Sequence, residues 1–125
     1  MTIEQRVHDL VENIKAGNIL DAFEKHYAPN CVMQENRNPP FVGKDVNRDR
    51  EKQFLASVKE WKSTNVRAVA VDDDGRAGDS GTSMIEIDFE FINTDGKPVR
   101  YEQVARQQWA NGQIVHERFY YDTGA

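Results

Sequence analysis

The sequence of 125 residues predicts an α+β fold, with three N-terminal helices packed on one face of a curved, mostly antiparallel sheet. One observation is a change of hydrophobic period: apolar residues recur at helical spacing in the first half and alternate with polar residues in the second. Another is the chain order, because three helices and a short strand precede four strands joined by short turns, as in an antiparallel meander. The length is typical of a single domain, residues 1–125.

Three helices are expected before the long strands. The first covers residues 2–16, and Thr2 and Gln5 have the spacing of a capping box at its start. The second lies between residues 18 and 29, and the third runs from 44 to about 62. The predicted inward-facing residues are Ile3, Val7, Leu10, Val11 and Ile14 in the first helix, Leu20, Phe23 and Tyr27 in the second, and Val46, Phe54, Leu55, Val58 and Trp61 in the third.

Five strands are expected. A short one, residues 31–36, lies between the second and third helices and is followed by a Pro-rich loop. The meander consists of residues 66–72, 84–92, 98–109 and 113–122. The regular alternation of the second meander strand turns its apolar odd-numbered residues toward the helices and leaves its even-numbered acids on the outer surface. These acids are Glu86, Asp88 and Glu90, and the connecting turns are residues 72–81, 93–97 and 110–112.

Composition and charge argue against several classes of protein. The net charge of −5 opposes nucleic-acid binding, which needs a basic face for phosphates. No apolar run approaches the roughly 18 residues that cross a membrane, and no signal-peptide core is recognised, so a cytoplasmic location is expected. A single Cys31 cannot form an internal disulfide, and with three scattered histidines it makes no zinc site. The charged residues of the third helix, Arg50 and Glu51 among them, are interpreted as a solvated face of mixed charge.

Three local motifs follow one another along nearly the whole chain. HYAPNCVMQEN (26–36) comes after a helix, and PPFVGKD (39–45) opens the next one. TDGK (94–97) precedes a strand that ends in Trp109, and NGQIVHERFYYD (111–122) comes last. In this order they resemble the SnoaL-like branch of the nuclear-transport-factor-two-like superfamily, whose enzymes include ketosteroid isomerase, limonene-epoxide hydrolase and polyketide cyclases. The resemblance implies a cone with a deep pocket between the helices and the concave face of the sheet, and a homodimer formed through the sheet.

The catalytic sets of two relatives fit this sequence only in part. The isomerase has a general base on its short first strand, where the resemblance places Glu35. Its oxyanion donors, however, would fall near Leu10 and near Ala105 or Arg106, which cannot stabilise an enolate in the same way. Steroid isomerisation is therefore not expected.

The epoxide hydrolase holds its attacking water with an Asp-Arg-Asp set, a Tyr and an Asn. The resemblance places these roles on the five residues Phe119, Glu86, Asp88, Met33 and Glu35, of which only Asp88 keeps the required type. The family register would also turn Asp88 inward, whereas the apolar alternation favours the surface for it, because unpaired buried carboxylates are costly. Epoxide hydrolysis is not expected either.

Two acids remain as catalytic candidates. Glu35 lies in the polar run that ends the first strand, and the resemblance turns Glu117 into the pocket from the last strand. Close carboxylates can act as acid and base, because proximity raises the pKa of one of them. For Glu35 the alternative is a solvated strand end. The expected substrate-binding residues are Phe23, Tyr27, Met33, Trp61, Tyr101, Gln103, Phe119 and Tyr121.

The function expected is binding of a small, largely apolar organic molecule in the pocket. Acid–base chemistry by Glu35, assisted by Glu117 or Tyr121 and without a metal or other cofactor, is the enzymatic hypothesis, covering isomerisation, cyclisation, dehydration or hydrolysis. The alternative is a non-catalytic module for ligand binding or dimerisation, which needs only an apolar pocket. The sequence does not identify the substrate.

Overall fold

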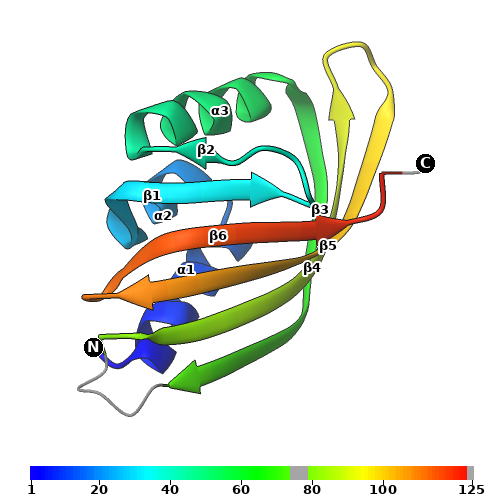
Figure 1. Ribbon diagram of the computed structural model, residues 1–125. Coiled ribbons are helices and arrows are strands. Elements are labelled where there is room, and N and C mark those ends of the chain that lie inside the picture. The colour runs from blue at the N-terminus through cyan, green and yellow to red at the C-terminus, as the bar shows by residue number, and fades with distance from the viewer. Residues whose placement is uncertain (74–78, 124–125) are drawn as a thin grey trace.

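A computed structural model describes residues 1–73 and 79–123, and it has the predicted α+β architecture. Figure 1 shows α1 and α2 behind a curved sheet and α3 beside the edge strand β2. In chain order the elements are α1 (Ile3–Lys15), α2 (Ile19–His26), β1 (Tyr27–Glu35), β2 (Phe41–Val42), α3 (Lys44–Ala56), β3 (Val58–Asp73), β4 (Gly81–Asn93), β5 (Pro98–Ala110) and β6 (Gln113–Tyr121).

The sheet has the strand order β2-β1-β6-β5-β4-β3. All neighbouring pairs are antiparallel except β1 and β6, so the predicted four-strand meander, β3 to β6, is confirmed. The hairpin between β5 and β6 turns at Asn111 and Gly112, with φ of 53° and 75°, the left-handed pair that a tight two-residue turn requires. The parallel pairing of β1 with β6 places Glu35 opposite Phe119, although the two residues are far apart in the chain.

The helices bury their apolar faces against the concave face of the sheet. Helix α1 begins with the predicted capping box, in which Gln5 N donates to Thr2 Oγ1 and Thr2 N donates to Gln5 Oε1. Its buried side chains join those of α2 and the odd-numbered residues of β4 in one core. This core contains Ile3, Val7, Leu10, Val11, Ala22, Phe23, Tyr27, Cys31, Met33, Ile85, Ile87, Trp109 and Ile114. Among the described residues, none of the helices combines the length and the apolar composition of a membrane span.

The predicted end of the third helix is wrong. Helix α3 ends at Ala56, and residues 58–62, expected to be helical, open the long strand β3 instead. There Val58 pairs with Asn93 of β4, and the ring of Trp61 stacks on Phe91 at a centroid distance of 5.7 Å. Pairing and aromatic packing against β4 thus override a helical spacing of apolar residues, as tertiary contacts commonly do for β-branched and aromatic side chains.

The first strand and its surroundings also differ from expectation. Strand β1 begins at Tyr27 rather than at residue 31, and its register with β6 shifts between Tyr27 and Val32, where Pro29 lies. A proline has no backbone N–H for the ladder, which is tolerated at such an irregularity. The short strand β2 lies inside the predicted Pro-rich loop. The predicted turn 72–81 is in part outside the described residues.

The predicted facing of β4 is confirmed, but the predicted exposure of Asp88 is wrong. Ile85 and Ile87 pack in the core, whereas Asp88 lies on the opposite face with only 2% of its side chain exposed. Two guanidinium groups cover it: Arg67 donates from Nε and Nη2 at 3.0 and 3.1 Å, and Arg100 donates from Nη2 at 2.6 Å. A carboxylate can be buried when it is paired with cations, as Asp88 is with Arg67 and Arg100. The alternation of apolar residues along β4 could not show this pairing.

Asp88→Asn is expected to lower the melting temperature at pH 7. The Arg67 hydrogen bonds hold the pKa of Asp88 below its ordinary value of 3.8, with Arg100 adding to the effect. Stabilisation by the ionised form is therefore present above that value and is lost as the pH falls through the native-state pKa. Melting followed by circular dichroism should show a deficit at pH 7 that shrinks toward pH 3. Equal melting temperatures at pH 7, for the variant and the wild type, would contradict it.

Candidate functional site

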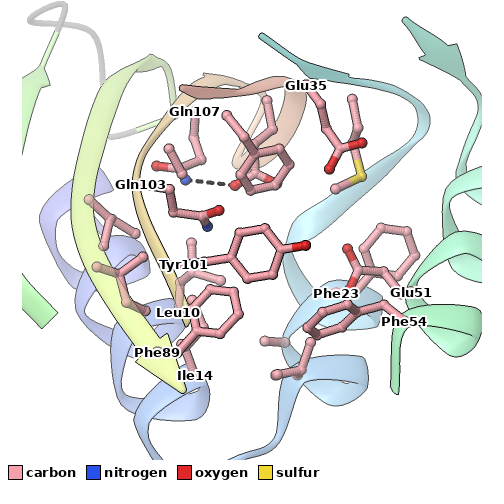
Figure 2. Close-up of a pocket in the computed structure, with 18 of the residues that line it drawn as sticks. Leu10, Ile14, Phe23, Glu35, Glu51, Phe54, Phe89, Tyr101, Gln103 and Gln107 are labelled. Carbon is pink, nitrogen blue, oxygen red and sulfur yellow. Dashed lines mark hydrogen bonds between the residues drawn. The ribbon is translucent and has the colours of Figure 1, made fainter. Parts of the chain in front are cut away.

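A cavity of about 220 Å³ lies between the three helices and the concave face of the sheet. Figure 2 shows part of its lining, with polar groups on the side chains of β5 and on Glu35 and Glu51 turned into an otherwise apolar space. Its lining consists of Leu10, Ile14, Ile19, Ala22, Phe23, Tyr27, Met33, Glu35, Arg50, Glu51, Phe54, Trp61, Thr64, Ile85, Ile87, Phe89, Tyr101, Gln103, Ala105, Gln107, Glu117, Phe119 and Tyr121.

The structure brings all the predicted site residues to this one cavity. Helix α2 and strand β1 supply Phe23, Tyr27, Met33 and Glu35, while Trp61 comes from β3. The neighbouring strands β5 and β6 supply the others, namely Tyr101, Gln103, Glu117, Phe119 and Tyr121. Their common location is observed, while the catalytic and binding roles assigned to them stay predictions.

Glu117 is the most deeply buried acid of the cavity, with 3% of its surface exposed. Both carboxylate oxygens accept hydrogen bonds. The Tyr27 hydroxyl donates to Oε1 at 2.5 Å, and Gln107 Nε2 donates to Oε2 at 2.7 Å (dashed line in Figure 2). These donors come from β1 and β5, the two strands that flank β6 in the sheet.

A chain of buried hydrogen bonds leads from the indole of Trp109 to Glu117. Trp109 Nε1 can only donate, and it donates to Ser83 Oγ at 2.9 Å. The Ser83 hydroxyl donates in turn to Gln107 Oε1 at 2.7 Å. The amide of Gln107, whose oxygen accepts from Ser83, presents its NH₂ group to Glu117. This buried network arranges the site to accept a carboxylate at position 117.

Burial raises the pKa of Glu117 from its ordinary value of 4.5 to about 7. The hydrogen bonds from Gln107 and Tyr27 act in the opposite direction, since they stabilise the ionised form, and the charge of Glu51 adds to the increase. Burial, followed by the charge of Glu117, also keeps the pKa of the Tyr27 hydroxyl well above its ordinary value, so this hydroxyl stays a donor. At neutral pH, Glu117 can both hold and release a proton.

Glu35 occupies a different environment, with 38% of its side chain exposed. Arg50 Nη2 donates to its Oε2 at 3.0 Å, and the Tyr121 hydroxyl donates to its Oε1 at 3.1 Å. Burial and the nearby charge of Glu35 raise the pKa of Tyr121 to about 12. Glu35 is thus an ion-paired acid, and the carboxylate whose charge acts on Glu117 is Glu51.

Glu51 is a site residue that the sequence interpretation missed. The sequence predicts a solvated face of the third helix for it, but Glu51 lines the cavity together with Arg50 and Phe54. The inward face of α3 also contains buried Asn47, whereas Val46, expected to point inward, is 47% exposed. The helical spacing of Asn47, Glu51 and Phe54 was the available signal, and the apolar character of Val46 obscured it. Within the described residues, no group of three potential metal ligands occurs.

A family model of the SnoaL-like domain matches residues 7–117, which is most of the chain. The chain belongs to the SnoaL-like domain family. No curated protein matches it in a sequence comparison. The predicted resemblance to the SnoaL-like family is confirmed.

Solved structures of similar fold agree with this SnoaL-like assignment. A protein from Mesorhizobium loti named as a SnoaL-like polyketide cyclase is 25% identical, with a TM-score of 0.71, over 97% of this chain and 100% of that one. A Bacillus subtilis protein named as an isomerase is 19% identical, with a TM-score of 0.74 and coverages of 98% and 90%. An LEH-like epoxide hydrolase from M. tuberculosis is 12% identical, with a TM-score of 0.70 and coverages of 96% and 78%. The last two likenesses show the fold alone.

Proposed function

We propose that this SnoaL-like protein carries out acid–base chemistry, without a cofactor, on a small and largely apolar organic molecule held in its cavity. The observation that carries the proposal is Glu117, a carboxylate with a pKa of about 7 inside an otherwise mostly apolar space. A group of this pKa is suited to remove and return a proton near neutral pH.

Removal of a proton from a carbon next to a carbonyl is the reaction class that this site supports best. The buried carboxylate of Glu117 lies in a mostly apolar cavity that can hold such a molecule, and isomerisation or cyclisation of a ketone can begin with this step. Two of the similar structures are named as a cyclase and an isomerase, which agrees with this class. Tyr27 and Gln107 hold the carboxylate of Glu117 in place from both oxygens, so that its ionised form is oriented before substrate binds.

We assign Glu35 the role of orienting the substrate beside the base. Its ion pair with Arg50 and its hydrogen bond from Tyr121 hold the Glu35 carboxylate in one position at the side of the cavity. The sequence predicts Glu35 as the acid–base group, assisted by Glu117 or Tyr121. We assign the main role to Glu117 instead, because its burial is a property of the folded chain. The proposed homodimer would form on the outer face of the sheet, where Met84 and Tyr120 are 44% and 42% exposed.

Deuterium exchange tests the proposal without knowledge of the natural substrate. A panel of small apolar ketones would be incubated with the wild-type protein in D₂O and followed by NMR. We expect exchange at the carbon next to the carbonyl to exceed the rate without protein, to rise with pH through about 7 and to level off above it, as Glu117 ionises. If exchange has the same rate with and without the protein and increases only with the hydroxide concentration, the proposal of proton removal next to a carbonyl is overturned.

A further inference from the structure

Glu51 presents a carboxylate to the cavity without a donor of its own. Among the described residues, no side chain donates a hydrogen bond to it, and no ammonium or guanidinium nitrogen lies within ion-pair distance. Figure 2 shows its carboxylate turned toward the same central space as the Tyr101 hydroxyl and the carboxylate of Glu35. A half-buried acid in this position is best satisfied by a donor that enters with the ligand.

The wall beside Glu51 is aromatic. Phe54 lies three residues further along α3, on the same side of the helix, and its ring meets Phe89 edge to face at 6.1 Å. Trp61 stacks on Phe89 at 5.3 Å, and Tyr101 lies at 5.3 Å from Phe89 on the other side. Aromatic faces attract cations through their negative π clouds, and a Trp face does so best.

The charged groups of the lining are predominantly acidic. Three carboxylates, Glu35, Glu51 and Glu117, face one guanidinium, Arg50. Arg50 is already engaged, because it donates to Glu35 at 3.0 Å and to Asn47 Oδ1 at 3.1 Å. A bound anion would meet an excess of negative charge, whereas a cation would reduce it.

We propose that the ligand of this cavity is a small, largely apolar molecule with a protonated amine, whose ammonium group binds Glu51 against the aromatic wall of Phe54, Trp61, Phe89 and Tyr101. This specifies the substrate class of the proposed function and rests on it for the use of the cavity. The ammonium donates to Glu51 and supplies the positive charge that the lining lacks. A neutral alcohol supplies the donor but not the charge, so it binds less tightly.

Three compounds that differ in one group test this assignment by isothermal titration calorimetry at about pH 8: 2-(2-naphthyl)ethylamine, 2-(2-naphthyl)ethanol and 2-naphthylacetate. We expect the amine to bind about 10-fold more tightly than the alcohol. The third compound, the carboxylate anion of 2-naphthylacetic acid, should bind least. In Glu51→Gln, the amine should lose about 10-fold in affinity, while the alcohol should change by less than about 2-fold. The alcohol therefore also reports that the variant cavity is folded.

Asp49→Asn is the matched control, because Asp49 is an exposed acid on the same helix. It should leave the affinities for all three compounds unchanged. Equal binding of amine and alcohol to the wild type, an unchanged amine affinity in Glu51→Gln, or no amine binding would each overturn the assignment. Ketone exchange that depends on Glu117, without an amine preference, would remove this inference and leave the proposed function. An amine preference without ketone exchange would leave this inference and remove the proposed function.

Discussion

Glu117→Gln is expected to lower the rate of ketone exchange by about 100-fold or more, the typical contribution of a positioned general base. The change removes the group that takes the proton but keeps the shape of the side chain. It leaves Tyr27 and Gln107 in place around position 117. The loss should appear in the rate of exchange rather than in the affinity for the ketone, because an apolar ligand gains little from the carboxylate before proton transfer begins.

Two further variants decide which acid is the base. Glu35→Gln should reduce the rate much less, because Glu35 is fixed by Arg50 and Tyr121 and is assigned to orientation. Glu86→Gln removes an exposed acid on the outer side of β4 and should have no effect. If Glu35→Gln abolished exchange and Glu117→Gln did not, the assignment of the base would be wrong and Glu35 would take that role.

The same Glu117→Gln change is expected to make the protein more stable relative to wild type as the pH rises. The pKa of Glu117 is about 7 in the folded protein and 4.5 ordinarily, so the folded state binds more protons than the unfolded state between these values. Wild-type stability therefore falls as the pH rises through this window and is level above it. At about 1.4 kcal/mol for each pH unit, the wild type loses about 3 kcal/mol through this one group. A glutamine does not titrate and loses nothing.

Urea unfolding of both proteins at pH 4.5 and at pH 8 measures this effect. The variant should gain about 3 kcal/mol on the wild type between the two values. Groups that titrate in both proteins without interacting with Glu117, such as His26, cancel in the difference. A pH-independent difference for Glu117→Gln would mean that Glu117 is ionised normally in the folded state. A functional acid held at a cost in stability is a common trade.

The sequence by itself determined the architecture and the location of the candidate site. Apolar residues recur with a period of 3.6 in the helices and of 2 in the strands. This periodicity predicts the helices, the meander and the position of Asp88 on the outer face of the sheet. The three motifs, at residues 26–45, 94–97 and 111–122, indicated the family, and the ten residues predicted for its pocket line one cavity.

Only the tertiary structure decided which of these residues differ chemically. The pKa of Glu117 depends on burial and on donors from β1 and β5, and the cover over Asp88 depends on Arg67 and Arg100 from two other strands. Glu51 has the same local sequence character as its solvated neighbours, and only the packing of α3 turns it into the cavity. Local patterns specify which face a side chain takes, whereas burial, charge pairing and proton affinity are set by residues distant in the chain, which periodicity does not encode.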